Sequence, residues 1–454
     1  MGISTVNPAT GETLRTFEPF SEDQIGAKLA LADTAFSQWR LTSFAVRSAA
    51  LQLTAELLET HKQPLGELLT LEMGKTLASA IAEVEKCVIA CRYYATHAEN
   101  MLSPKEVSTA ASRSFIRYSP LGPILAVMPW NFPFWQVFRF AAPALMAGNV
   151  CLLKHASNVP QAALAIEDIF RRAGLPLGTF QTLLIDAAQV EPILKDSRVA
   201  AVTLTGSELA GRSIASAAGA QIKKCVLELG GSDAFIVMAS TDIESTAAMA
   251  VKGRTVNNGQ SCIAAKRFIV VDAIYDRFEA AFVNGMRDLR IGDPMLPATQ
   301  LGPMATAKLR DDLHLQVLDA VHAGAKILTG GNKIDGPGFY YQPTVLAEVP
   351  RDSASFREEF FGPVAMIFRA RDAAHALEIA NDSPFGLSAS VWTDDRTERD
   401  FFIRHLATGM VFVNANTAST PELPFGGVKR SGFGRELSEV GLHEFVNIQS
   451  VWIG

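Results

Sequence analysis

Short apolar runs alternate with helical segments between Ile124 and Glu228, and this alternation limits the folds open to the chain. The run ILAVMPW at 124–130 predicts a buried strand, and the pattern of 134–147 predicts a helix. The same alternation continues to KCVLEL at 224–229. Such βαβ repeats are typical of a mostly parallel sheet covered by helices on both faces. The sequence therefore predicts an α/β fold whose ligands bind beyond the carboxyl ends of the strands.

Polar residues and glycines stand where these predicted strands end. They are Pro129-Trp130-Asn131, Lys154, Thr205-Gly206-Ser207 and Glu228. The usual glycine-rich dinucleotide fingerprint is absent, but Gly206 and Ser207 open a predicted helix. A helix N-terminus offers free N–H groups and the positive end of the helix dipole to a pyrophosphate. An ordinary Ser-capped helix is the alternative interpretation of this pair.

A carboxylate and a thiol, Glu228 and Cys262, are the strongest candidates for chemistry. Glu228 ends an apolar run shortly before Gly230-Gly231, and Cys262 follows the polar, turn-prone segment 257–261. A thiolate attacks a carbonyl carbon well, and a partly desolvated carboxylate acts as a general base toward a thiol or a water. A small core cysteine and a plain strand end are the alternative interpretations.

Length, charge and cysteine content restrict the class of protein. The chain has 454 residues, which indicates two or three domains. Its net charge of −6 argues against a nucleic-acid or anionic-membrane partner. No apolar stretch is long enough to cross a membrane, and the first residues lack the pattern of a secretory signal. The cysteines form no CxxC pair and the histidines no HExxH motif, which favours a reduced, cytoplasmic protein without a metal site.

Two further regions have their own patterns. Helical periodicity predicts helices over 21–100. Residues 106–118 alternate around a small-residue middle, which indicates a β-hairpin, and 444–453 indicates a further strand that could pair with it. Apolar strands near a chain end must pair somewhere, and we expect a second subunit there. The expected assembly is a homodimer or a tetramer built from dimers.

Seven motifs in one order carry a family resemblance. They are PWNFP at 129–133, Lys154, TGS at 205–207, ELGG at 228–231, GQSC at 259–262, EEFFGP at 358–363 and PFGG at 424–427. Together they resemble the NAD(P)-dependent aldehyde dehydrogenase superfamily. The similarity extends from NPATG at 7–11 to the C-terminal strand, and so covers essentially the whole chain.

The resemblance implies a fold with three parts. A Rossmann-like cofactor domain would comprise 1–105 and 121–228, and an α/β catalytic domain would comprise 229–420. An oligomerisation β-arm would comprise 106–120 and 435–454, with 421–434 returning the chain to the cofactor domain.

The resemblance also implies site roles. Cys262 would attack an aldehyde to form a thiohemiacetal, with the Asn131 amide and the Cys262 backbone N–H as oxyanion donors. After hydride transfer to the nicotinamide, a water activated by Glu228 would hydrolyse the thioester. Lys154 would hold the adenosine-side ribose and Glu359 the nicotinamide ribose. The implied cofactor site comprises Met128, Pro129, Trp130, Lys154, Ser157, Gly206, Ser207, Leu229, Glu359 and Phe361.

Ser157 favours NADP over NAD. In NAD-preferring members of the superfamily a Glu commonly lies three residues after the Lys that matches Lys154, and Ser157 occupies that position here. The hydroxyl removes the charge that would repel a 2′-phosphate, and Lys154 is able to pair with that phosphate. NAD is the weaker alternative.

Several segments, including KHA at 154–156 and AAKRF at 264–268, resemble bacterial succinate semialdehyde dehydrogenases. The carboxylate of that substrate requires a cation, and Arg139 matches a carboxylate-binding Arg of other such enzymes, at the mouth of the tunnel to Cys262. Ser419 matches a second contact. A further Arg of some relatives is replaced by Val256, and a redox-partner cysteine by Ala264, so no disulfide switch is expected.

Other activities on the same fold are the alternatives. One is an aldehyde dehydrogenase of broader specificity for other small aldehydes and carboxyaldehydes. A second is a coenzyme-A-acylating enzyme, whose relatives generally lack a Glu at the position of Glu228. A third is a catalytically silent structural or binding protein, which the retention of Cys262, Glu228 and Asn131 opposes.

Overall fold

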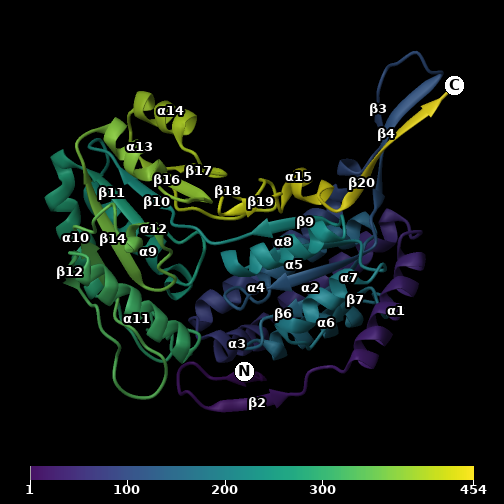
Figure 1. Ribbon diagram of the computed structural model, residues 1–454, viewed down its shortest axis with the longest axis horizontal. Coiled ribbons are helices and arrows are strands. Elements are labelled where there is room, and N and C mark those ends of the chain that lie inside the picture. The colour runs from purple at the N-terminus through teal and green to yellow at the C-terminus, as the bar shows by residue number, and fades with distance from the viewer. Residues whose placement is uncertain (1) are drawn as a thin grey trace.

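Two largely parallel sheets organise the chain in the computed structural model, which describes residues 2–454 (Figure 1). The first sheet has six strands in the order β19-β9-β8-β5-β6-β7, and the second has seven in the order β12-β13-β14-β11-β10-β16-β17. Only the edge strands β19 and β12 run antiparallel to their neighbours. The predicted α/β class is confirmed.

The first sheet comes from the alternating segment that the sequence predicts. Its strands are β5 (Pro123–Met128), β6 (Val150–His155), β7 (Phe180–Thr182), β8 (Ala201–Thr205), β9 (Lys224–Glu228) and β19 (Gly432–Phe433). The intervening helices are α5 (Trp135–Ala147), α6 (Pro160–Arg172), α7 (Val190–Lys195) and α8 (Glu208–Ala220). Every residue of α5 is buried, because this helix lies between the sheet and the N-terminal helices.

Four N-terminal helices cover this sheet, as the periodicity of 21–100 predicts. They are α1 (Glu22–Trp39), α2 (Phe44–Thr60), α3 (Lys62–Met73) and α4 (Leu77–Met101). Cys87 and Cys91 lie one turn apart on the buried face of α4 and belong to the same hydrophobic core as the sheet. This burial gives both cysteines a packing role.

The second sheet is built from residues 234–413. Its strands are β10 (Ala234–Val237), β11 (Arg267–Val271), β12 (Lys326–Thr329), β13 (Thr344–Ala347), β14 (Val364–Ala370), β16 (Ser388–Trp392) and β17 (Met410–Val413). Its longer helices are α9 (Ile243–Thr255), α10 (Tyr275–Arg287), α11 (Ala307–His322), α13 (Ala373–Asn381) and α14 (Arg396–His405). Two further cores form on the faces of this sheet.

The projecting arm pairs strands from distant parts of the chain. β4 (Arg113–Pro120) lies between β3 (Lys105–Glu106) and β20 (Val446–Ile453), and both pairings are antiparallel. The expected pairing of the hairpin with the C-terminal segment is therefore confirmed. Figure 1 shows this arm extending away from both sheets, with the C-terminus at its tip. A short helix, α15 (Ser438–His443), connects it to the body.

Strand order locates the place where a ligand fits. From β5 the chain proceeds to β6 and β7 on one side of the sheet and then returns to β8 and β9 on the other. Ligands of open α/β sheets bind at such a switch point, outside the carboxyl ends of the strands. Here those ends are Met128 of β5 and Thr205 of β8, and Pro129-Trp130-Asn131 and Gly206-Ser207 follow them directly.

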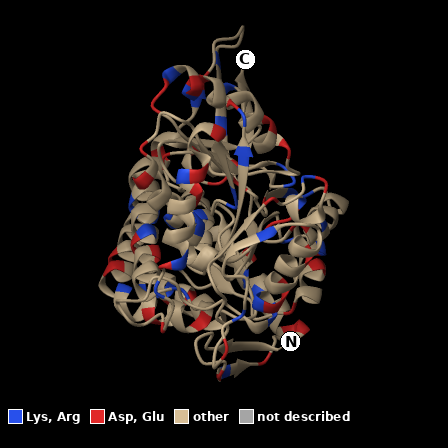
Figure 2. Ribbon diagram, turned by 90° about the vertical axis from the view of Figure 1, so that its left-hand side faces the viewer, with Lys and Arg blue, Asp and Glu red and all other residues tan. Residues whose placement is uncertain are grey.

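The surface mixes charges of both signs. Figure 2 shows the side of the molecule that lies at the left in Figure 1. Lys and Arg are interspersed there with Asp and Glu along the helices, and no broad region carries charge of one sign only. Within residues 2–454 no helix is both long and apolar enough to cross a membrane.

Candidate active site

A pocket of about 250 Å³ brings together residues from both sheets. Most of the predicted cofactor and catalytic residues line it. The lining comprises Pro129, Trp130, Asn131, Gln136, Thr205, Gly206, Ser207, Leu229, Gly230, Cys262, Leu309, Glu359 and Phe361. The rings of Trp130 and Phe361 meet edge to face, with their centres 5.7 Å apart. The pocket therefore joins the switch point of the first sheet to the cysteine loop of the second.

The loop before Cys262 has an unusual backbone. Asn257, Asn258 and Gly259 all have positive φ angles, of 54°, 57° and 76°. Asparagine tolerates this left-handed conformation better than most residues, and a Cβ at position 259 would collide with the backbone of Gly362. The polar, turn-prone segment 257–261 is thus a strained turn, and it places Cys262 in the wall of the pocket.

Buried side chains fix this turn to its surroundings. Asn257 Nδ2 donates to the carbonyl oxygen of Asn131 at 2.7 Å, and Asn258 Nδ2 donates to that of Gly74 at 2.8 Å. Strained backbone persists only where its surroundings over-determine it, and it concentrates at functional sites. These two amides supply that restraint. The Asn257 amide also connects the loop before Cys262 to the loop that carries Asn131.

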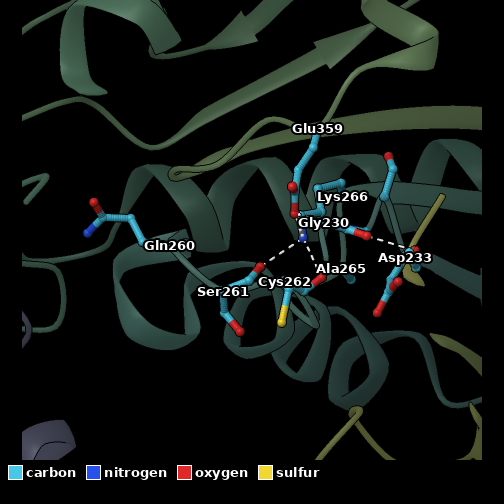
Figure 3. A network of polar contacts seen from close by, with 12 residues as sticks. Gly230, Asp233, Gln260, Ser261, Cys262, Ala265, Lys266 and Glu359 are labelled. Carbon is cyan, nitrogen blue, oxygen red and sulfur yellow. Dashed lines mark hydrogen bonds and ion pairs between the residues drawn. The ribbon is translucent and has the colours of Figure 1, made fainter. Parts of the chain in front are cut away.

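Lys266 forms a second anchor, shown in Figure 3. Its Nζ donates to the carbonyl oxygens of Ser261 (2.8 Å) and Cys262 (2.6 Å) and lies 3.0 Å from Glu359 Oε1. The Cys262 side chain points away from this network, so its sulfur stays free. Lys266 was missed as a site residue, although it belongs to the AAKRF segment, because its contacts arise only in the fold.

Two N–H groups near Cys262, the Asn131 side-chain amide and the Cys262 backbone N–H, are able to donate hydrogen bonds to a ligand. Asn131 is 3% exposed, and its Nδ2 donates to the Gln260 carbonyl oxygen at 3.0 Å, which leaves the second amide hydrogen free. Gln136 donates to Asn131 Oδ1 at 3.1 Å and so fixes the orientation of the amide. Within residues 2–454 the Cys262 backbone N–H has no acceptor. These are the predicted oxyanion donors, and both line or adjoin the pocket.

The Cys262 thiol is held in its protonated form. Burial raises the pKa of Cys262 to about 12, against the opposing influence of Lys266 and Arg139. A thiol with so high a pKa needs a base or a bound ligand to ionise it.

Glu228 is buried at the end of β9. Both carboxyl oxygens lack a hydrogen-bond partner within the described residues, and a Cβ at Gly426 would collide with one of them. Burial, and next the neighbouring Glu436, raise the pKa of Glu228 well above its usual range and so favour its protonated form. Its neighbour Leu229 lines the pocket but Glu228 itself does not.

Arg139 is buried and paired with a carboxylate of the protein itself. Its side chain is 2% exposed, forms an ion pair with Glu436 and lies 3.3 Å from Thr205 Oγ1. The ring centre of Phe425 is 4.3 Å from its guanidinium carbon. Arg139 does not line the pocket that contains Cys262, and its place at a tunnel mouth stays a prediction. The apolar neighbours of Arg139 correctly indicated a buried guanidinium that needs an anion, but Glu436, far along the chain, supplies that anion.

Ser419 lies at a buried polar junction. Its Oγ accepts from Trp135 Nε1 at 2.9 Å and from Lys86 Nζ at 2.6 Å. The preceding residue, Ala418, lines a second pocket of about 390 Å³, as do Val256 and Ile263. Because Cys262 lines the first pocket and Ile263 the second, the nucleophile loop separates the two. Lys86 was not singled out in the sequence, where it is one lysine of a long helix.

The remaining predicted cofactor residues lie along the carboxyl edge of β5 and β6. Met128 ends β5, Lys154 lies near the end of β6, and Ser157 follows that strand. Burial lowers the pKa of Lys154, whereas the charge of Asp186 raises it, and no carboxylate lies within ion-pair distance of Lys154 among residues 2–454. Neither Lys154 nor Ser157 lines the first pocket; Ser157 lines a separate small pocket, and the cofactor roles of both residues stay predictions.

No group of three or more His, Cys, Asp or Glu side chains is placed to hold a metal ion in the part of the chain that the structure describes. The five cysteines are all free.

Comparison with known proteins accounts for these features. The model of the aldehyde dehydrogenase family matches residues 1–451. A succinate-semialdehyde dehydrogenase [NADP(+)] 1 of Mycobacterium tuberculosis (strain H37Rv) is 55% identical over the full length of both chains. A succinate-semialdehyde dehydrogenase [NADP(+)] of Mycobacterium avium (strain 104) is 54% identical, covering 100% of this chain and 97% of the relative.

Solved structures agree. The succinic semialdehyde dehydrogenase of Streptococcus pyogenes in complex with NADP+ superimposes with a TM-score of 0.97 at 37% identity, covering 99% of each chain. The structure of Gox0499, described for its cofactor and substrate selection, gives a TM-score of 0.99 at 41% identity over 100% of each chain. The chain therefore belongs to the aldehyde dehydrogenase family.

Proposed function

We propose that this protein oxidises succinate semialdehyde to succinate, with NADP as the preferred cofactor. The observation that carries the proposal is the position of Cys262, which lines one pocket together with Asn131 while the next residue, Ile263, lines a second pocket. One pocket accepts a cofactor at the switch point, and the other leaves an independent approach for an aldehyde. The names of the relatives with 54% and 55% identity support the choice of substrate and cofactor.

The residues fit a phosphorylated dinucleotide. Ser207 caps the N-terminus of α8 by accepting from Ala210 N, and this helix start faces the first pocket together with Gly206. Lys154 has no carboxylate partner among the described residues, and Ser157 adds no negative charge beside it. Bound NADP supplies the two-electron oxidant that accepts a hydride.

The chemistry of the chain then follows in order. The Cys262 thiol first loses its proton to solvent water. The sulfur then bonds to the aldehyde carbon, the carbonyl π electrons move to the oxygen, and Asn131 Nδ2 and the Cys262 N–H stabilise the negative charge there. Loss of hydride from that carbon leaves a thioester. A water loses a proton to the ionised Glu228, its oxygen bonds to the acyl carbon, and the carbon–sulfur bond breaks to release the acid. Because burial favours the protonated form of Glu228 and its side chain does not line the first pocket, Glu228 must ionise and turn toward the pocket to act as this base.

Steady-state rates test the proposal. The specificity constants for succinate semialdehyde and butanal, each with NADP and with NAD, should be highest for succinate semialdehyde with NADP, and succinate should be the product. Similar constants for both aldehydes would instead identify an enzyme of broad specificity. Absence of cofactor reduction with every aldehyde would favour a catalytically silent protein.

We also propose a homo-oligomer in the cytoplasm. On the edge strand β20 the side chains of Ile448, Trp452 and Ile453 are 58%, 62% and 45% exposed, and an unpaired apolar edge favours association with a second chain. Five free cysteines suit a reducing compartment. Sedimentation of the protein and of Trp452→Glu tests the assembly: the variant should shift toward the monomer.

A further inference from the structure

The loop that carries Asn131 is held by side chains from other parts of the chain. This loop, residues 129–134, connects β5 to α5, and its two prolines have no N–H to donate. Near its start the Asn131 carbonyl oxygen accepts from Asn257 Nδ2 at 2.7 Å. Where the loop enters α5, two backbone N–H groups donate to Glu83 Oε1 of α4 at 2.8 and 3.0 Å. The conformation of the loop therefore depends on partners outside it.

His155 holds the middle of this loop. It ends β6 beside the last residue of β5, and it is 6% exposed. Its Nδ1 accepts from Ala156 N at 2.9 Å, which places the single ring hydrogen of the neutral imidazole on Nε2. Nε2 donates this hydrogen to the Pro133 carbonyl oxygen at 2.8 Å. Burial lowers the pKa of His155 to about 4, so the imidazole stays neutral near pH 7 and both contacts persist.

The contact between His155 and Pro133 connects two parts of the proposed site. His155 lies between Lys154 and Ser157, the proposed cofactor residues, whereas Pro133 lies two residues after Asn131, the proposed oxyanion donor. The carbon that loses a hydride and the oxygen that Asn131 stabilises belong to one carbonyl group. The two segments must therefore keep a fixed relative position, because a misplacement of about 1 Å costs as much as about 100-fold in rate.

We propose that His155 is a positioning residue: its hydrogen bond to the Pro133 carbonyl oxygen fixes the loop that presents the Asn131 amide to the substrate oxygen. The imidazole does not line the pocket that contains Cys262, so its effect passes through Asn131. This assignment rests on the proposed function, in which Asn131 stabilises the oxyanion.

Three substitutions separate the hydrogen bond from the volume of the side chain. His155→Leu removes the donor and His155→Asn is too short to reach Pro133, whereas His155→Gln keeps an N–H near the position of Nε2. At saturating NADP, the single-turnover rate of cofactor reduction should fall about 10- to 100-fold in the first two variants and stay within about fivefold in His155→Gln. The loss should be the same with succinate semialdehyde and with butanal, because an oxyanion forms on either aldehyde. His322→Leu, at an exposed histidine in the last turn of α11, is the control and should leave the rate unchanged.

A double-variant cycle tests whether His155 acts through Asn131. Asn131→Ala alone should lower the same rate about 100- to 1000-fold. Adding His155→Leu to it should lower the rate by less than about threefold more, because the donor that His155 positions is already gone. Iodoacetamide should modify Cys262 equally fast in His155→Leu and in the unmodified protein, since that displacement forms no oxyanion. If His155→Leu does not fold, His155→Asn takes its place in the cycle.

Three results would overturn the assignment. They are an unchanged rate in His155→Leu, the same fractional loss with and without Asn131, and slower iodoacetamide modification of Cys262 in His155→Leu, which would indicate general damage to the site. An unmodified protein that prefers butanal would instead overturn the proposed substrate, and the variants compared on butanal would still decide the role of His155.

Discussion

Arg139 and Glu436 form an ion pair in which both side chains are almost fully buried, at 2% and 1% exposure. Arg139 comes from α5, and Glu436 comes from the segment that leads into α15. The pair adjoins the catalytic carboxyl, because both residues influence the pKa of Glu228. Arg139 is therefore occupied by a carboxylate of the protein beside Glu228, the proposed general base.

Removal of Arg139 should destabilise the protein. Arg139→Met leaves Glu436 buried without its cation, and breaking a buried ion pair by removing one partner costs about 3–5 kcal/mol of unfolding free energy. The double variant Arg139→Met/Glu436→Gln should recover part of this loss because no uncompensated charge remains. Denaturant unfolding measures both, with Arg92→Met as the exposed control. Losses for Arg139→Met no larger than for that control would contradict the structure.

Ser157 should control the choice of cofactor. Ser157→Glu places a carboxylate against the 2′-phosphate, and a lost charge-assisted contact plus repulsion is worth roughly 2–4 kcal/mol, or about thirty- to thousand-fold, toward NAD. Ser157→Ala removes only the hydroxyl, so it should shift the ratio of specificity constants by less than about tenfold. If neither variant changes that ratio, Ser157 does not face the adenosine ribose.

Thioester hydrolysis should accelerate as the pH rises. Burial and the neighbouring Glu436 raise the pKa of Glu228 well above its usual range, and only the ionised form accepts a proton from water. The rate of thioester hydrolysis should therefore still rise with pH in the range where an ordinary glutamate would already be fully ionised. Glu436→Gln removes a neighbouring group that raises the pKa of Glu228, so the profile should move to lower pH. Single-turnover rates across the pH range measure this; an identical profile in the variant would show that Glu228 titrates independently of Glu436.

Lys266 should assist ionisation of the nucleophile. After burial, Lys266 is the strongest influence on the Cys262 thiol, and it lowers the pKa of that group. Lys266→Met should slow iodoacetamide modification of Cys262 at a fixed pH and lower kcat for every aldehyde. Lys308→Met, at an exposed lysine paired with Asp312, is the control. Faster modification in Lys266→Met would mean that Lys266 instead shields the thiol.

Local patterns were enough to predict the α/β class and the residues at the strand ends. Apolar strand runs, turn residues and helix starts act over a few positions, so ILAVMPW and TGS could be placed on elements without the structure. The polar contacts of Ser419 and Arg139 depend on tertiary packing that no local pattern reveals. Lys86 meets Ser419 across 333 positions, and Arg139 finds Glu436 in a segment that reads as structural. The apolar neighbours of Arg139 in the sequence indicate that its guanidinium is buried, but only tertiary packing decides that Glu436 is its partner.

The covalent intermediate offers the most direct measurement. Glu228→Gln should form the thioester but hydrolyse it slowly, so the intermediate accumulates. After mixing this variant with succinate semialdehyde and NADP, intact-protein mass spectrometry should show a gain of one succinyl group per chain. Peptide mapping should place that group on Cys262, and omission of NADP or the additional change Cys262→Ala should abolish it. A modified residue other than Cys262, or full turnover by the Cys262→Ala enzyme, would contradict the account.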